Sequence, residues 1–298
     1  MTSGDGRTLS VSVCLPALDE EATIGSICES VRRALIPGLV DELLVIDSGS
    51  TDSTAAVAAA SGATVYQVDA IEPRLRQGGK GEALWKSVAV AKGDVVVWID
   101  SDIRDFDPRF VSGLVEPLLF LPEVVMTKAY YRRPLALGRG PFGEGGGRVT
   151  ELALRPLLNL LRPEMARIIQ PLSGEYAMRR DVARRLPFFS GYGVDIALLM
   201  DVIDRYGQDA VRQVDLGTRV HHNRTLNELG RTSFEVMTAF MARLQDEGSL
   251  TLHTPMGETL RQFDRRHREV VTCPEIVELP AWVNVGKEQW ADRVAAAI

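Results

Sequence analysis

Apolar runs alternate with amphipathic segments along the first third of the chain. The runs LSVSVCLPAL (9–18) and VVVWI (95–99) are apolar at nearly every position, and the segments between such runs repeat their apolar residues at helical spacing. Strands that are apolar on both faces are typical of a parallel sheet covered by helices on both sides. We therefore predict an α/β fold, with strands at 9–18, 42–46, 64–68 and 94–99 and helices at 20–36, 51–60 and 82–91.

The pattern is looser after residue 107. It predicts a second half built from two strands and four helices, with a glycine-rich loop at 138–147. The strands are expected at 124–131 and 213–222, and the helices at 109–120, 148–161, 194–206 and 234–247. A further helix is expected near 287–297, packed on the core or on a second subunit.

Composition narrows the class of protein. A net charge of -6 over 298 residues disfavours a general nucleic-acid binder. No apolar run approaches the ~18 residues of a spanning helix, and the polar residues 1–8 do not resemble a signal peptide, so we expect a cytoplasmic protein that binds no membrane. Cys14, Cys28 and Cys273 lack the spacing of a zinc site and are expected to be buried free thiols.

The strongest chemical signal is the sequence DSD (100–102), which directly follows the run VVVWI. Open parallel sheets bind ligands beyond the carboxyl ends of their strands. The carboxylates of Asp100 and Asp102 are hard oxygen ligands at such a place, and they suit Mg²⁺ or Mn²⁺. An acidic turn that only caps the next helix is the alternative.

Other polar segments follow strands or precede helices. The carboxylate of Asp47, in DSGSTD (47–52), either binds a ribose or base or closes the turn, and PALDEE (16–21) ends the first strand. The basic turn GGKGEAL (78–84) precedes a helix whose free N–H groups favour anions, although a plain glycine-rich turn is the alternative. It lacks the spacing of a P-loop, and no GxGxxG follows the first strand, which disfavours a dinucleotide-dependent dehydrogenase.

Two clusters in the second half could bind anions or a metal. In GGGRVT (145–150), backbone N–H groups, the helix dipole and a guanidinium would together hold a phosphate or carboxylate. At the end of a late strand, Arg219, His221 and Asn223 share one face. A neutral imidazole there would supply the metal ligand that the aspartates lack, whereas a structural histidine is the alternative.

Taken together, these motifs resemble those of known glycosyltransferases. PALDEE, DSGSTD, GKGEALW (79–85) and DSD occur in the order found in family-two-like enzymes of the GT-A fold. The second half resembles the glucosyl-3-phosphoglycerate synthase family in GGGRVTEL, RPLL, QPLSGEYA, GYGVDI and RxHxN. The resemblance implies a retaining, metal-dependent enzyme that transfers glucose from UDP-glucose to 3-phosphoglycerate.

The resemblance also assigns roles to individual residues. The implied metal ligands are Asp102 and His221, with Mg²⁺ or Mn²⁺ as cofactor. The nucleotide-sugar-binding residues are Pro16, Leu18, Glu20, Asp47, Ser48, Lys80, Asp100, Ser101 and Tyr192. The acceptor-binding residues are Gly147, Arg148, Thr150, Arg219 and Asn223. The catalytic candidates are Asp102, Asp195 and Glu175, the last two as the nearest protein nucleophiles.

One departure from the family keeps a second donor open. Where glucosyl enzymes usually carry Glu in GYGVE, this chain has Asp195, at the position that faces the donor sugar. A carboxylate that is shorter by one methylene changes the hydrogen bonding of a sugar hydroxyl. A mannosyl-3-phosphoglycerate synthase that uses GDP-mannose, or an enzyme of dual specificity, is therefore the close alternative. A nucleotidyltransferase and a non-catalytic nucleotide-sugar-binding module are the more distant ones.

We expect one GT-A domain in two halves. Residues 1–8 are predicted to be disordered, 9–107 to bind the nucleotide sugar and 108–248 to bind the acceptor. The tail 249–298 is predicted to lie at the subunit contact of a homodimer.

Overall fold

The structure is a computed structural model. It describes residues 9–36, 38–132, 134–135, 143–144, 147–219, 225–264, 266–274 and 276–285.

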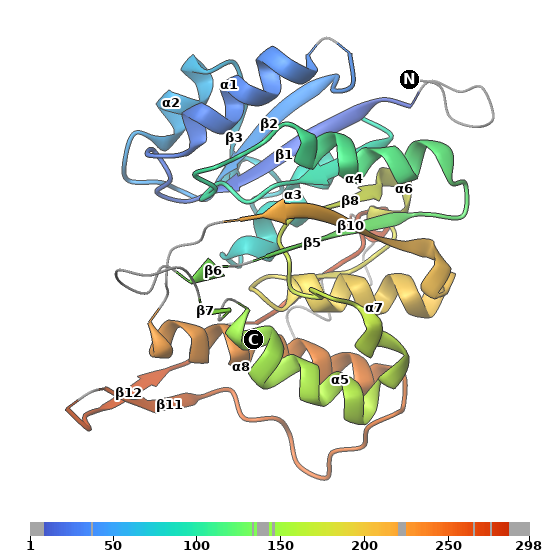
Figure 1. The fold of residues 1–298 in the computed structure, drawn as a ribbon. Coiled ribbons are helices and arrows are strands. Elements are labelled where there is room, and N and C mark those ends of the chain that lie inside the picture. Colours follow the sequence, from blue (N-terminus) through green and yellow to red (C-terminus); the bar gives the residue numbers. More distant parts are fainter. Residues whose placement is uncertain are drawn as a thin grey trace.

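One seven-stranded sheet forms the centre of the fold (Figure 1). Its strand order is β10-β5-β8-β4-β1-β2-β3, and β8 runs antiparallel to both of its neighbours while the other pairs are parallel. The bounds are β1 (Val11–Ala17), β2 (Glu42–Asp47), β3 (Thr64–Gln67), β4 (Val95–Trp98), β5 (Met126–Arg132), β8 (Tyr176–Arg179) and β10 (Val211–Thr218). The predicted α/β fold with a mostly parallel sheet is confirmed, and the sheet runs through both predicted halves.

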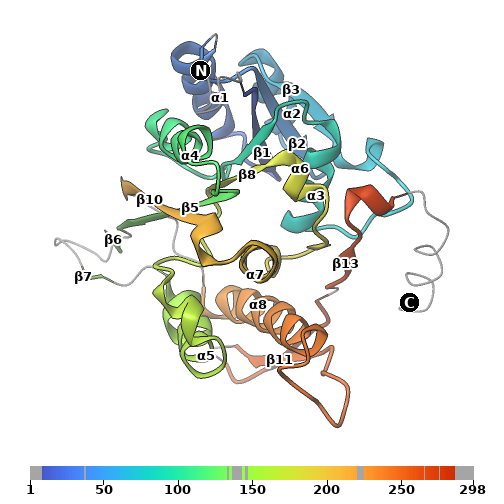
Figure 2. The same cartoon turned by 90° about the vertical axis from the view of Figure 1, so that its right-hand side faces the viewer.

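Helices cover both faces of the sheet (Figure 2). One face packs against α1 (Ile24–Leu35), α2 (Thr54–Ala60) and α4 (Arg109–Phe120). The other packs against α3 (Lys80–Val90) and α7 (Val194–Tyr206), and α8 (Leu226–Asp246) packs on α7. The short helices α5 (Arg155–Leu161) and α6 (Arg180–Ala183) complete the fold. The sandwich explains why the central strands are apolar on both faces: β4 is buried at every position.

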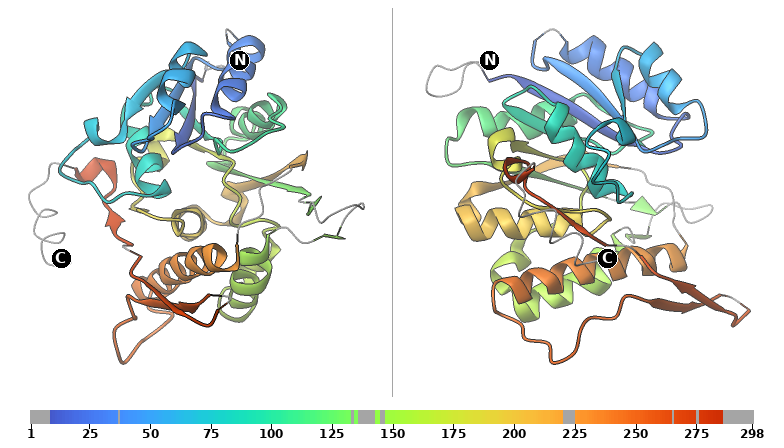
Figure 3. Two further views of the ribbon diagram at one scale, coloured as in Figure 1. Left: turned by 90° about the vertical axis from the view of Figure 1, so that its left-hand side faces the viewer. Right: turned by 180° about the vertical axis from the view of Figure 1, so that it is seen from behind.

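The C-terminal segment runs beside α8 and ends against α3, one of the helices that cover the second face of the sheet (Figure 3). Strands β11 (Leu260–Phe263) and β12 (Glu269–Thr272) form a hairpin, and β13 (Glu278–Leu279) pairs with β9 (Phe188–Phe189). Trp282, in the 3-10 turn η5 (Trp282–Asn284), stacks on Trp85 of α3 at 4.0 Å, and the indole of each tryptophan donates to a backbone carbonyl in the other segment. Residues 276–285 therefore pack against the core of the domain, whereas the β11–β12 hairpin is largely exposed.

Several predicted elements have different bounds in the structure. Helix α8 begins at Leu226 rather than near residue 234, because Thr225 and Glu228 form a capping box. The predicted helix 148–161 contains a π-helical turn, η2 (Thr150–Leu154), before α5. The late strand ends at Thr218, and residues 220–224, like the predicted helix 287–297 and residues 1–8, lie outside the described residues.

The cysteine prediction is partly wrong. All three thiols are free, and Cys14 and Cys28 are buried as expected, but Cys273 is exposed. It follows strand β12, whose own residues are mostly exposed. Within the described residues, no helix is both long and apolar enough to cross a lipid bilayer.

Gly81 is the closest approach between α3 and the segment that carries β9. A Cβ at this position would overlap the carbonyl oxygen of Phe189, which is backbone and cannot turn away. We expect Gly81→Ala to reduce the free energy of unfolding by about 3 kcal/mol in urea denaturation, because the helix must move to relieve the overlap. Gly257→Ala is the control, since its Cβ would meet open space. Equal urea midpoints of unfolding for the two variants would contradict the close contact between Gly81 and Phe189.

Candidate functional site

The strand order brings several charged side chains to one edge of the sheet. Asp100 and Asp102 follow β4 and Arg219 follows β10, so all three leave the carboxyl ends of parallel strands. Strand β8 runs in the opposite direction, and the residue before its start, Glu175, therefore lies at the same edge. This is the edge at which open α/β sheets bind their ligands.

Arg219 is the centre of this charged group. Its buried guanidinium donates to Asp102 Oδ1 at 2.7 Å and to Asp100 Oδ2 at 3.4 Å, and it forms a close ion pair with Glu175. It also donates to the hydroxyl of Tyr131 at 3.0 Å, and that hydroxyl donates to Glu175 Oε2 at 2.8 Å. Burial alone would lower the pKa of Arg219, but the carboxylates, Glu175 first, raise it well above its usual value. The guanidinium is therefore a permanent cation.

Lys80 is a second cation at the same edge. Its ammonium lies 3.0 Å from Asp100 Oδ1 and 3.3 Å from Asp195 Oδ2, in the first turn of α7. Burial lowers its pKa, but Asp100 and then Asp195 more than offset this and raise it. Lys80 thus joins Asp195 to the DSD motif, and the anion-binding role of its turn stays a prediction.

The turn before Lys80 is held by a buried ion pair. Glu82 Oε2 accepts hydrogen bonds from the backbone N–H groups of Gln77 and Gly78, and Glu82 Oε1 lies 2.6 Å from the ammonium of Lys86. Both charged side chains are fully buried. The glycine-rich turn is therefore a fixed support for Lys80 rather than a flexible loop.

A glycine makes room for the DSD carboxylate. A Cβ at Gly174 would overlap the carboxylate of Asp100, so the sequence SGEY (173–176) needs glycine at this position. The close packing fixes Asp100 between Lys80 and Arg219.

The predicted nucleotide-binding residues lie along the ends of β1, β2 and β4. Leu18 is exposed and Pro16, Glu20 and Ser48 are half-buried. Burial, then the charges of Asp102 and Asp100, raises the pKa of Glu20, so this region carries an excess of negative charge. An excess of carboxylates in a half-buried position favours the binding of a cation.

Two other predicted nucleotide ligands are engaged within the protein. The carboxylate of Asp47 accepts hydrogen bonds from Ser50 and from Gln67 Nε2, so it closes the turn, which was the alternative interpretation. The hydroxyl of Ser101 donates to the carbonyl of Pro16 at 2.7 Å and joins the ends of β4 and β1. Their contacts with a nucleotide stay predictions.

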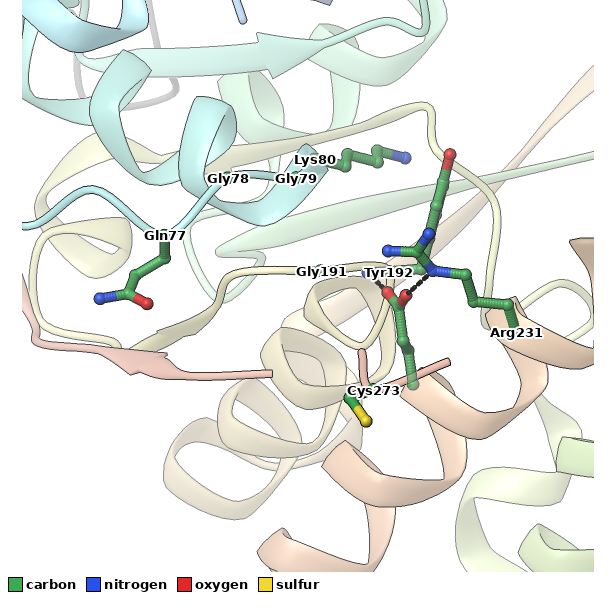
Figure 4. Close-up of a pocket in the computed structure, with 9 residues that line it drawn as sticks. Gln77, Gly78, Gly79, Lys80, Gly191, Tyr192, Arg231 and Cys273 are labelled. Atoms are coloured by element: carbon green, nitrogen blue, oxygen red, sulfur yellow. Dashed lines mark hydrogen bonds and ion pairs between the residues drawn. The ribbon is translucent and has the colours of Figure 1, made fainter. Parts of the chain in front are cut away.

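A pocket of about 300 Å³ lies beside the Lys80 turn (Figure 4). Tyr192, predicted to contact the nucleotide sugar, is at its wall, and its backbone N–H donates to the buried Glu235 at 2.8 Å. Glu235 also pairs with Arg231 at 3.1 Å. The full lining is Gln77, Gly78, Gly79, Lys80, Gly191, Tyr192, Arg231, Glu235 and Cys273.

Of the predicted acceptor residues, Arg219 lies in the charged group described above, and three others, Gly147, Arg148 and Thr150, lie on a separate element. Gly147, with a φ of 78°, begins the segment that leads through Arg148 into η2, and Thr150 is buried in its first turn. Asn223 and the predicted metal ligand His221 lie outside the described residues. The anchoring of an acceptor by this group stays a prediction.

The carboxylates of the DSD motif fit a divalent cation. In the part of the chain that the structure describes, no group of three or more His, Cys, Asp or Glu side chains is placed so that it alone could hold a metal ion. Asp100 and Asp102 are only partly exposed, and Mg²⁺ or Mn²⁺ is often held by one or two carboxylates together with substrate phosphates and water. The described donors therefore fit an ion that is completed by substrate.

Sequence reasoning missed three residues of the site, Lys128, Tyr131 and Tyr176. Tyr131 supports Arg219 and Glu175, and the ammonium of Lys128 lies 4.1 Å from the centre of the Tyr176 ring. The presence of a lysine in the mostly buried strand β5 was a signal that Lys128 belongs to a functional site, since a charge is rarely buried without a partner.

The comparisons with known proteins point in one direction. The sequence profile of glycosyl transferase family 2 matches residues 12–163. The chain is 51% identical to a glucosyl-3-phosphoglycerate synthase of Mycobacterium tuberculosis over 87% of this chain and 82% of that one. It is 43% identical to the enzyme of that name from Petrotoga mobilis, over 94% and 88%.

Solved structures agree with the sequence comparison. A crystal structure of the M. tuberculosis enzyme in complex with Mn²⁺, UDP-glucose and phosphoglyceric acid has a TM-score of 0.82 and 45% identity, over 92% of this chain and 90% of that one. Another, with Mn²⁺, UDP and glucosyl-3-phosphoglycerate, also has a TM-score of 0.82.

Removing the guanidinium of Arg219 tests its role as the counter-charge of Asp100, Asp102 and Glu175. We expect Arg219→Met to reduce the free energy of unfolding by about 3–5 kcal/mol, because Glu175 is left as an uncompensated buried charge. Urea denaturation measures the loss. The double variant Arg219→Met with Glu175→Gln should recover part of it, since no buried charge is then unpaired. A single variant as stable as the wild type would contradict the arrangement.

Proposed function

The chain belongs to glycosyl transferase family 2 and, within it, to the glucosyl-3-phosphoglycerate synthases, and on this premise we propose that it transfers glucose from UDP-glucose to 3-phosphoglycerate. The observation that carries the proposal is the convergence of Asp100, Asp102, Lys80 and Arg219 at the ligand-binding edge of the sheet. The same fold in M. tuberculosis holds Mn²⁺, UDP-glucose and phosphoglyceric acid.

The site has the charges that the reaction needs. Asp102, with Asp100 beside it and His221 as the further predicted ligand, would hold the divalent cation, which when bound neutralises charge on the leaving diphosphate. Lys80 lies between Asp100 and Asp195 and adds a fixed positive charge at the junction of donor sugar and diphosphate. Preorganised charges of this kind supply much of the rate of an enzyme.

The acceptor is held from the other half of the domain. Arg148, Thr150 and Asn223, with the N–H groups that follow Gly147, would bind the phosphate and carboxylate of 3-phosphoglycerate. Arg219 is already engaged by three carboxylates, so its part is to hold those groups in place beside the acceptor.

The surroundings of the two carboxylates predicted as nucleophiles favour a mechanism without a covalent intermediate. Glu175 is fully buried behind Arg219 and Tyr131, and Asp195 is almost fully buried and bonded to Lys80. We infer that the acceptor hydroxyl attacks from the face that the diphosphate leaves, and that a leaving phosphate oxygen accepts its proton. This accounts for retention of configuration.

The other expectations stand differently. Membership of this enzyme family leaves the nucleotidyltransferase and the non-catalytic binding module without support. The homodimer and the cytoplasmic location stay proposals. The shorter side chain of Asp195 is the observation that keeps transfer from GDP-mannose open as a second activity.

The metal site can be tested by ligand binding. We expect Mn²⁺ to strengthen the binding of UDP to the wild type, and Asp102→Asn to reduce that gain by roughly 10-fold or more, because a carboxylate ligand is lost. Isothermal titration of UDP with and without Mn²⁺ measures it. Asp107→Asn is the control, since Asp107 pairs with Arg109 outside the site. An equal gain in Asp102→Asn and the wild type would remove Asp102 from the metal site.

The choice of donor can be tested with a panel of UDP- and GDP-sugars and 3-phosphoglycerate. We expect UDP-glucose to give the highest rate of nucleoside diphosphate release, and Asp195→Glu to lower the rate with GDP-mannose relative to UDP-glucose by about 10-fold, because one methylene in a hydrogen-bonding side chain changes which hydroxyl it reaches. Asp209→Glu, at an exposed position beyond α7, is the control. An unchanged donor ratio in Asp195→Glu would show that residue 195 does not read the sugar.

A further inference from the structure

Lys128 is a fully buried lysine to which the reaction as described gives no role. It lies in β5, in register with Tyr176 of the neighbouring strand β8, and its ammonium is 4.1 Å from the centre of the Tyr176 ring. It makes no hydrogen bond or ion pair with any residue that the structure describes. Lys86, the other fully buried lysine in this region, has both Glu82 and the carbonyl of Val68 as partners. Lys128 is therefore not an ordinary buried ion pair.

Two more polar atoms beside Lys128 lack a hydrogen-bond partner among the described residues. They are the hydroxyl of Tyr176 and Asp195 Oδ1, both buried. The Tyr176 hydroxyl lies near the Asp195 carboxylate without a well-aligned hydrogen bond, and Asp195 is the carboxylate that acts most strongly on both Tyr176 and Lys128. The other oxygen of Asp195 is bonded to Lys80.

The carboxylates of the site account for a positive charge at Lys128. Four carboxylates gather here, Asp100, Asp102, Glu175 and Asp195, and within the described part of the chain Lys80 and Arg219 form ion pairs with them. Burial, reinforced by Lys80, lowers the pKa of Lys128 to about 8, while Asp195 is the main group that opposes this. The ammonium is thus still charged at neutral pH, and it is a third cation beneath the carboxylates.

A purely structural explanation is weak for this residue. An apolar side chain of similar length would fill the same space without the cost of burying an unpaired ammonium. Selection for stability alone therefore does not favour a lysine at this position. Selection for a fixed positive charge in the site does favour it.

We propose that Lys128 is a positioning residue for Asp195, and that its ammonium, enclosed beneath Tyr176, holds and balances the carboxylate that together with Lys80 receives the hydroxyl groups of the donor sugar. The inference rests on the proposed transfer from a nucleotide sugar. It assigns Lys128 to the sugar and not to the nucleotide, because the ammonium is enclosed against Tyr176, and the Tyr176 hydroxyl and Asp195 Oδ1 are the other buried atoms here that lack a hydrogen-bond partner among the described residues.

The test is Lys128→Met, measured for both activity and stability. We expect kcat/KM for UDP-glucose to fall roughly 10-fold to 100-fold, because Asp195 loses its support, while the affinity for UDP with Mn²⁺ stays within about twofold. The Tm should be unchanged or higher, since an unpaired buried charge is removed. A purely structural role predicts the opposite pattern, a lower Tm and wild-type kcat/KM in the folded fraction, and would overturn the proposal.

A double-mutant cycle with Asp195→Asn shows whether Lys128 acts through Asp195. We expect Lys128→Met to change kcat/KM for UDP-glucose by less than about twofold when Asp195 is already Asn. The proposal would be overturned if the losses in kcat/KM of the two single variants simply multiplied in the double variant. It would also be overturned if Lys128→Met lost affinity for UDP by the same factor as kcat/KM. Arg162→Met is the control, because Arg162 pairs with Asp204 near the opposite end of α7, and it should lose stability without a change in kcat/KM.

Failure of the proposed function has a different signature. If wild-type protein releases no nucleoside diphosphate from UDP-glucose with 3-phosphoglycerate, the proposed function is wrong. If the wild type is active and Lys128→Met matches it, only the role of Lys128 is wrong.

Discussion

The guanidinium of Arg219 is the constraint on which the site depends. One buried cation is in contact with three carboxylates from two segments, Asp100 and Asp102 after β4 and Glu175 before β8. Glu175 is fully buried and could not be packed at the edge of the sheet without a counter-charge, because burying an unpaired charge is more costly than most single contacts can offset. The geometry of the DSD motif is therefore set by a residue more than a hundred positions later in the chain.

The antiparallel strand β8 makes this arrangement possible. In a fully parallel sheet, the residue before a strand lies at the edge opposite the binding site. Because β8 is reversed, Glu175 lies beside Asp100, and Gly174 provides the space that the Asp100 carboxylate fills. The sheet departs from the parallel pattern at the place where the charged group is assembled, so topology and chemistry depend on each other here.

The sequence predicted those parts of the site that are local. The alternation of apolar runs with helices located the strands, and the rule that ligands bind beyond strand ends singled out Asp100, Asp102 and the turn of Lys80. The missed parts depend on contacts between distant segments. Tyr131 is an ordinary residue of a strand by sequence, and the partner of the buried Lys128 could not be identified from the sequence. The reversal of β8 has no local signature, and the folded tail depends on the contact between Trp282 and Trp85.

The three cations of the site, Lys80, Arg219 and Lys128, differ in position and therefore in role. Lys80 and Arg219 touch the carboxylates directly and lie where substrate charge is expected, whereas Lys128 lies beneath Tyr176, out of reach of solvent. A charge that is enclosed in this way is not screened by water or salt, so it acts on Asp195 with the same strength whether or not substrate is present. Such a fixed field needs no reorganisation when the glycosidic bond breaks, which is the property that makes preorganised charge effective in catalysis.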